Sequence, residues 1–318
     1  MELMNISLKA NVKTLYPLKF KPVFIEKVWA GRLCENVPEK TGEVWSIVDR
    51  LEHQSIISEG PQSGKTLSRL IRENPEGVLG KGREAKQFPI MVKLINAGEK
   101  LSVQVHPGKD GPKGSESKSE MWYILNKEDD ARVYLGFKKD FTAKEIQSSL
   151  KSDSIVNLLN VYSSCVGDSY FIPAGTVHAL GAGNLVLEIQ QNSDSTYRLY
   201  DWGRRDSKGE FRKLHKSEGL KSIRPARYKK GINWEIEQPS FSLKEIIDTD
   251  WSTVFEVSGD YVLNCREESC FTVSAVEVCF IQYEQFEIKL AIGESALIPA
   301  ALERVNIKGE KWLLTKVK

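Results

Sequence analysis

Two histidines and a glutamate stand in strand-like contexts that suit metal chemistry. In the run Leu101-Ser-Val-Gln-Val-His106, apolar residues alternate with polar ones. On a strand this alternation places Gln104 and His106 on the same face. A proline and a loop rich in Gly, Ser and Lys follow, and Glu120 opens the next apolar run. Strands joined in this way pair easily, which predicts that Glu120 lies opposite His106.

A third candidate ligand follows a turn, in Pro173-Ala-Gly-Thr-Val-His178. Two imidazoles, a carboxylate and the amide oxygen of Gln104 form a donor set for a divalent transition metal, with zinc the first choice. Such a set leaves a position for water or substrate. The alternative is that these are ordinary polar residues at strand ends. Because the chain has only four histidines and two of them stand in this context, the sequence favours the metal site.

These residues have to be positioned by short strands, because the dominant periodicity of the sequence is two. The apolar runs are separated by Gly, Pro, Asn and Ser. Many short strands with turn signals between them predict a mainly β protein, a sandwich or barrel rather than a parallel α/β sheet. The predicted strands include 43–49, 101–106, 121–125, 169–173, 185–190 and 271–280.

Two segments show helical patterns, and both are expected to flank the barrel. The first, at about 66–80, places Leu67, Leu70 and Ile71 at helical spacing before Pro75. The second, at about 142–160, opens with Thr142 and has glutamate three residues later, which is the pattern of a capping box. Apolar residues at helical spacing follow in it.

A weak internal repeat indicates a second β unit. Gly167-Asp-Ser-Tyr-Phe-Ile-Pro-Ala174 is echoed by Gly293-Glu-Ser-Ala-Leu-Ile-Pro-Ala300. Arg304 stands in the second copy at the position that His178 has in the first. We therefore predict a catalytic domain over residues 1–235 with the two helical insertions, and a smaller C-terminal β domain without metal ligands over 236–318. The basic stretch 224–230 is interpreted as a solvated linker.

Composition excludes several kinds of partner. Forty-five basic and 43 acidic residues nearly balance over the 318 residues, so neither nucleic acid nor an anionic membrane is expected. No apolar stretch approaches the length of a membrane span. The five cysteines include no C-x-x-C pair, which favours free thiols in a reducing compartment and therefore the cytoplasm.

Several motifs together resemble a known family. Gly167-x5-Pro-x-Gly-x2-His178 is similar to the second cupin motif, with Ala182 where asparagine is usual, and Gln104-Val-His106 stands where the first motif has His-x-His. With the runs beginning at Glu120 and Glu188, the chain resembles the class I mannose-6-phosphate isomerases in their short bacterial form, over roughly residues 20–220. The resemblance implies a cupin or jelly-roll-like barrel with a degenerate cupin at the C-terminus.

The same resemblance implies the chemistry and its residues. D-Mannose 6-phosphate and D-fructose 6-phosphate would be interconverted through an enediol, with one Zn²⁺ per chain. The implied metal ligands are His106, Glu120 and His178, with Gln104 as the fourth. The implied catalytic residues are Arg198 and Glu188, and the implied substrate-binding residues are Lys93, Ser102 and Lys118. Arg198 would act electrostatically and Glu188 is a candidate base, although the group that takes the C–H proton stays open.

Two rival functions use the same barrel. Two histidines and a carboxylate also form the triad of a non-haem iron oxygenase. A non-catalytic sugar-phosphate-binding cupin is the second rival, and the presence of both Arg198 and Glu188 argues against it. The expected partner is a small sugar phosphate. The sequence leaves the oligomeric state open and is compatible with a monomer.

Overall fold

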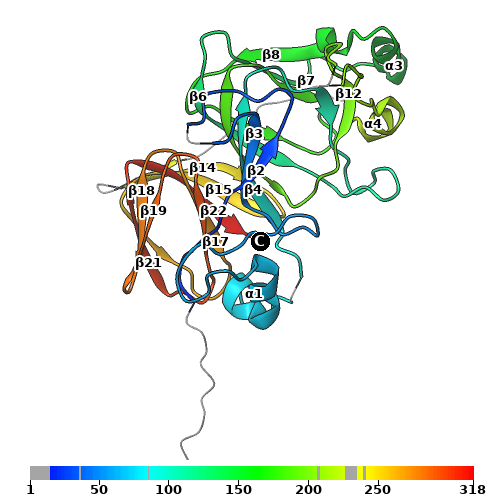
Figure 1. The fold of residues 1–318 in the computed structure, drawn as a ribbon. Coiled ribbons are helices and arrows are strands. Elements are labelled where there is room, and N and C mark those ends of the chain that lie inside the picture. Colours follow the sequence, from blue (N-terminus) through cyan, green and yellow to red (C-terminus); the bar gives the residue numbers. More distant parts are fainter. Residues whose placement is uncertain (1–14, 36, 85, 206–207, 226–234, 239–240) are drawn as a thin grey trace, which may run out of the picture.

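The structure is a computed structural model that describes all residues except 1–14, 36, 85, 206–207, 226–234 and 239–240. The described residues form four antiparallel sheets and a few short helices (Figure 1). Two sheets make the upper half in this view, and two make the lower half, which holds the C-terminal strands drawn in orange and red. The mainly β fold class with few helices is confirmed.

Residues 23–200 supply the strands of two facing sheets. One has the strand order β2-β3-β4-β11-β6-β9, and the other β12-β5-β10-β7-β8. Their inner faces share an apolar core in which Ile95, Trp122 and Val186 meet Val133 and Leu180. The strands of the first sheet are Val23–Glu26, Thr41–Ile47, Ile90–Ala97, Asn184–Gln191, Glu120–Lys127 and Ser169–Ile172. Those of the second are Tyr197–Tyr200, Val103–Val105, His178–Leu180, Arg132–Phe137 and Leu159–Ser163.

Residues 235–317, together with the short N-terminal strand β1, form the C-terminal half of the fold. It contains a seven-stranded sheet, β1-β20-β17-β22-β15-β14-β13, and a four-stranded sheet, β16-β21-β18-β19. The larger sheet consists of Leu18–Lys19, Ser295–Ile298, Phe271–Ala275, Lys311–Val317, Ser252–Gly259, Phe241–Asp248 and Glu235–Gln238. The smaller one consists of Tyr261–Asn264, Arg304–Gly309, Cys279–Tyr283 and Phe286–Leu290. The predicted strand 271–280 is therefore two strands, β17 and β18, in different sheets.

The two halves pack through one continuous apolar core. Val44 and Leu94, on the outer face of the first sheet, belong to the same cluster as Val273 and Leu313 of the seven-stranded sheet. The short strand β1 near the start of the described chain pairs with β20, so the N-terminal segment joins the C-terminal sheet. The predicted boundary near residue 235 falls beside residues outside the description and stays a prediction.

Of the two predicted helical segments, the second flanks the barrel as expected, whereas residues 77–79 of the first hydrogen-bond to Cys270, Ala300 and Ala301 of the C-terminal unit. The capping box of Thr142 is confirmed, because its side chain accepts from the backbone N–H of Glu145 and the glutamate side chain returns to Thr142. α3 (Ala143–Lys151) and α4 (Lys216–Ser222) lie side by side against the five-stranded sheet (Figure 1). The predicted helix 142–160 is shorter in the structure, since Asp153 has a left-handed φ of 53°. A 3₁₀ turn (Ile155–Leu158) and strand β8 follow it.

The first helical segment divides at Asn74. α1 (Leu67–Glu73) is capped by Thr66, and α2 (Pro75–Leu79) begins with proline at its first turn. Proline is tolerated there because that position has no intrahelical partner for its nitrogen. No helix in the described part of the chain has both the length and the apolar character that a membrane span requires.

The repeat seen in the sequence is also structural. Gly167 and Gly293 both have positive φ values, 88° and 81°, and each precedes a strand that ends at proline. His178 opens β10 and Arg304 opens β21, so the two residues hold equivalent places. In the described part of the C-terminal half, no group of three metal-ligating side chains was found.

Candidate metal centre

Three of the predicted ligands meet inside the barrel. His106 follows β5, Glu120 opens β6 and His178 opens β10. The Nε2 atoms of His106 and His178 lie 3.1 and 3.2 Å from the two carboxylate oxygens of Glu120. All three side chains are buried, and their ligand atoms lie within 4.8 Å of one another.

The proximity of His106 and Glu120 was predicted, but the proposed strand pairing is wrong. β5 pairs with β10 and β12, whereas β6 pairs with β9 and β11 in the other sheet. The segment 107–119 therefore crosses from one sheet to the other. Glu120 reaches His106 across the barrel interior, not along a ladder.

Hydrogen bonds fix which imidazole nitrogens face the cluster. Nδ1 of His106 lies 2.9 Å from the carbonyl oxygen of Ser195, and Nδ1 of His178 lies 2.9 Å from that of Thr176. A carbonyl only accepts, so each Nδ1 carries the proton. The lone pairs of both Nε2 atoms then point toward the carboxylate of Glu120.

This arrangement could hold a metal cation at its centre. Nε2 of His106 and the Glu120 carboxylate oxygen that faces His178 are buried without a hydrogen-bond partner, and the other oxygen of Glu120 is ion-paired with Lys118 at 2.9 Å. Burial and the nearby Lys118 lower the pKa of His106 to about 3, so this imidazole is neutral at pH 7. Burial alone would raise the pKa of Glu120, but Lys118 and the two histidines together outweigh it, and the pKa lies well below its usual value. Lone pairs facing a carboxylate repel it, and a divalent metal ion relieves that repulsion.

Gln104 borders the cluster. Its backbone pairs with His178, and its amide Nε2 lies 3.2 Å from Nε2 of His178. Its amide oxygen accepts from the hydroxyl of Ser102 at 3.2 Å. Rotation of the amide by 180° exchanges the two atoms and turns the oxygen toward the cluster.

The predicted lysines and Glu188 lie together beside the cluster. Lys118 Nζ is 2.9 Å from Glu120 and 3.8 Å from Glu188, and Lys93 Nζ is 3.1 Å from Glu188. The indole N–H of Trp122 donates to Glu188 at 2.7 Å. Burial and the charge of Glu120 raise the pKa of Glu188. Burial would lower the pKa of Lys93, but neighbouring carboxylates, Glu188 first, outweigh it and raise the pKa.

Arg198, on β12, lies level with Gln104 and His178 in the five-stranded sheet. It is paired with Gln104, which is paired with His178. One guanidinium nitrogen donates to the carbonyl of Lys213, while the buried Nε has no hydrogen-bond partner. Burial, followed by the charge of Arg212, lowers the pKa of Arg198. Every predicted site residue is thus in or beside the barrel interior, with Arg198 at its margin.

Sequence reasoning missed Glu43 on β3. Its carboxylate accepts from the indole N–H of Trp45 at 2.7 Å and lies 3.1 Å from Lys27 and 3.6 Å from Lys93. Burial would raise the pKa of Glu43, but Lys93 and then Lys27 lower it to about 2. The available signal was a charged residue inside an apolar strand-like run.

Glu43 is expected to make stability depend on pH. Its folded-state pKa of about 2 lies below the ordinary value, so ionised Glu43 stabilises the fold at neutral pH. This contribution is lost as the pH falls from about 4.5 toward 2. In urea unfolding of metal-free protein, Glu43→Gln should lower the free energy of unfolding at pH 7 by on the order of 2 kcal/mol, and by much less at pH 2.

Glu73→Gln provides the matched control. The pKa of Glu73 is also lowered to about 2, by hydrogen bonds from Lys65 and Arg69, but the group is exposed. Its effect should be smaller and should vanish in 1 M salt, because salt screens exposed ion pairs. An equal loss of stability in the two variants would contradict the buried role of Glu43.

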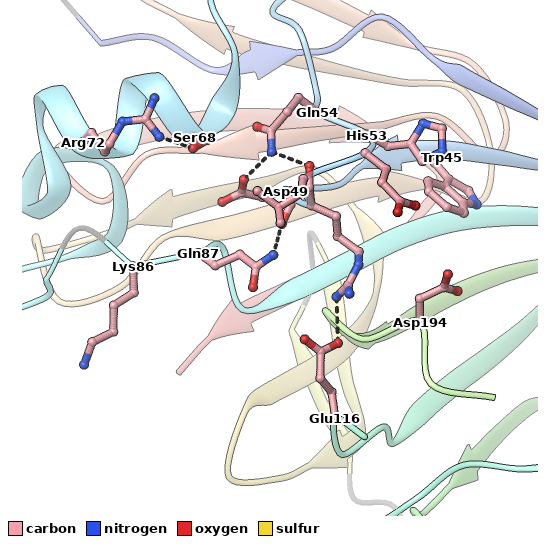
Figure 2. Close-up of a pocket in the computed structure, with 13 residues that line it drawn as sticks. Trp45, Asp49, His53, Gln54, Ser68, Arg72, Lys86, Gln87, Glu116 and Asp194 are labelled. Carbon is pink, nitrogen blue, oxygen red and sulfur yellow. Dashed lines mark hydrogen bonds and ion pairs between the residues drawn. The ribbon is translucent and has the colours of Figure 1, made fainter. Parts of the chain in front are cut away.

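A separate cavity of about 570 Å³ is lined by Trp45, Asp49 and His53, among others (Figure 2). It contains none of the predicted site residues. Several of its charged groups are already engaged. Asp49 accepts from Gln54, as Figure 2 shows, and Arg50 pairs with Glu116 at 2.9 Å.

Comparisons with known proteins agree with the geometry. Residues 27–153 match a family model described as the catalytic domain of type I phosphomannose isomerase. A putative mannose-6-phosphate isomerase of Bacillus subtilis, YvyI, is 33% identical over 315 residues, covering 95% of this chain and 98% of that protein. A probable mannose-6-phosphate isomerase of the same organism, GmuF, is 39% identical over 218 residues, covering 65% of this chain and 68% of that protein. The crystal structure of a mannose 6-phosphate isomerase from B. subtilis aligns with a TM-score of 0.86 at 30% identity, covering 95% of this chain and 99% of that one.

Proposed function

This chain belongs to the type I phosphomannose isomerase family, and from that premise we propose that it interconverts D-mannose 6-phosphate and D-fructose 6-phosphate with one bound zinc ion. It is an aldose–ketose isomerase. The observation that carries the metal proposal is the convergence of two imidazole lone pairs on the buried carboxylate of Glu120.

His106, Glu120 and His178 would hold the zinc, with the amide oxygen of Gln104 as the fourth ligand. Three nitrogen and carboxylate ligands with an additional oxygen match the donors that catalytic zinc takes in proteins. When bound, zinc would polarise the carbonyl or the adjacent hydroxyl of the sugar.

Glu188 is proposed as the base that moves the proton between C2 and C1. Its raised pKa and its contact with Lys93 suit a group that gives and takes a proton inside a buried site. We assign Lys93, Lys118 and Ser102 to the sugar oxygens near the reacting carbons, because both lysines already contact buried carboxylates there.

Arg198 is proposed to stabilise negative charge on the substrate. Its buried Nε has no partner, and Arg204 and Arg212, which flank it, are both paired with Asp201. A guanidinium keeps its proton, so its role is electrostatic. The excess of positive charge at this margin suits a sugar phosphate.

The rival functions are not favoured. Membership of the isomerase family speaks against an iron oxygenase, although the same triad could hold iron. The non-catalytic cupin is disfavoured because Glu188 and Arg198 are both present beside the cluster. We also propose the cytoplasm as the location, since all five cysteines are free thiols. The near balance of charge supports no nucleic-acid partner.

The function is tested by coupled turnover of mannose 6-phosphate. Purified protein should lose activity on chelation and regain it with about one equivalent of zinc per chain, because the triad would hold the zinc that polarises the sugar. Zinc content is measured alongside by atomic absorption. If fully metallated protein does not form fructose 6-phosphate, the isomerase proposal fails. Consumption of oxygen by iron-loaded protein would then favour the oxygenase.

A further inference from the structure

A line of alternating charges runs from the protein surface to the candidate base. Lys27 Nζ lies 3.1 Å from one oxygen of Glu43, and Lys93 Nζ lies 3.6 Å from the other. Lys93 Nζ also lies 3.1 Å from Glu188. The side chain of Lys27 is 31% exposed, whereas those of Glu43 and Lys93 are 10% exposed. Lys27 is therefore the outer end of the line.

We propose that Lys27 is a positioning residue for the isomerisation, and that it acts through Glu43 to hold the Lys93 ammonium against Glu188. The inference rests on the proposed function, because the Lys93–Glu188 pair then lies at the reacting carbons. Lys27 itself touches none of the residues assigned to the metal or the base.

The argument is a competition between two carboxylates for one ammonium group. Glu43 and Glu188 both contact Lys93, and Glu188 is the nearer by 0.5 Å (3.6 against 3.1 Å). Lys27 neutralises part of the charge of Glu43 and so weakens its attraction for Lys93. Without Lys27, Lys93 would be the remaining cation beside Glu43. Glu43 would then attract the Lys93 ammonium more strongly and draw it away from Glu188, because charges interact strongly in a buried site.

The backbone around Lys27 supports a fixed position. Lys27 directly follows β2, and its backbone N–H donates to the carbonyl of Lys40. Its side chain lines a surface cavity of about 810 Å³ that Lys40 also lines. Because the side chain borders solvent, Lys27→Met should fold without leaving a core void.

Two indole groups report on the two carboxylates of the line. Trp45 donates to Glu43 at 2.7 Å and Trp122 donates to Glu188 at 2.7 Å. In full-length metal-free and zinc-loaded Lys27→Met, the ¹⁵N–¹H signals of both indoles should shift relative to the unaltered protein. A shift of Trp45 alone would show that the effect ends at Glu43 and would overturn the proposal. Lys40→Met, from the same cavity, should shift neither signal.

Kinetics separate positioning from substrate binding. Lys27→Met should lower kcat roughly tenfold with KM nearly unchanged, because misplacement of a reacting group affects the chemical step. Lys27→Arg, which keeps the charge, should restore most of kcat. A rise in KM at constant kcat would show that Lys27 binds the substrate directly and would overturn the proposal. If the unaltered protein does not isomerise mannose 6-phosphate, the proposed function fails, while the indole signals still decide the role of Lys27.

Discussion

His178→Ala is expected to remove both the bound metal and the activity. His178 is fully buried, and its Nε2 faces Glu120 and Gln104 while Nδ1 is held by the carbonyl of Thr176. A tetrahedral zinc site binds with about 10–16 kcal/mol, or roughly 3 kcal/mol per ligand, so the loss of one ligand should weaken binding on the order of 100-fold or more. Turnover at substoichiometric zinc should fall to background.

The measurement is zinc affinity by competition with a chromophoric chelator, followed by turnover at increasing zinc concentration. His53→Ala is the matched control, because His53 lies outside the triad, packed edge-on against Trp45. It should bind zinc as the unaltered protein does. Unchanged zinc affinity in His178→Ala, with an unchanged melting temperature, would remove His178 from the ligand set and contradict the site.

The sequence predicts the local features of this site well. Alternation along residues 101–106 is enough to place Gln104 and His106 on one face, because side chains on a strand alternate. The Thr142 capping box is likewise a local pattern, and it is present in the structure. Features of this kind depend on residues within a few positions of one another, so periodicity and spacing reveal them.

Long-range partners could not be predicted in the same way. The approach of Glu120 to His106 depends on the segment 107–119 crossing between sheets, which no local pattern specifies. Glu43 was missed for a related reason. Alternation does not distinguish a buried, paired charge from an exposed one. The partners of Glu43 are Lys27, at the end of β2, and Lys93, on β4, and no local pattern connects them with it. The four candidate ligands were already indicated by their strand and turn contexts, and the family motifs agree with them.

Glu188→Gln is expected to lower kcat by about 10²–10⁴-fold, the usual contribution of a general base. The substitution keeps the shape of the side chain, and the amide oxygen can still accept from Trp122. KM and zinc content should change little, since the charged neighbours of Glu188 are Lys93 at 3.1 Å and Lys118 at 3.8 Å, and neither is a proposed metal ligand. The decisive measurement is exchange of the C2 hydrogen of deuterated mannose 6-phosphate with solvent, followed by NMR.

The pH dependence of kcat tests the assignment of Glu188 as the base. Burial and the charge of Glu120 raise the pKa of Glu188, so the ionised base is lost on acidification at a pH above the ordinary glutamate value. In the unaltered enzyme kcat should therefore fall as the pH drops through this raised pKa, and Glu188→Gln should lack that acidic limb. If Glu188→Gln still exchanges the C2 hydrogen at the normal rate, the base is another group. Lys93, 3.1 Å from Glu188, would not replace it, because the neighbouring carboxylates raise the pKa of Lys93 and keep it protonated.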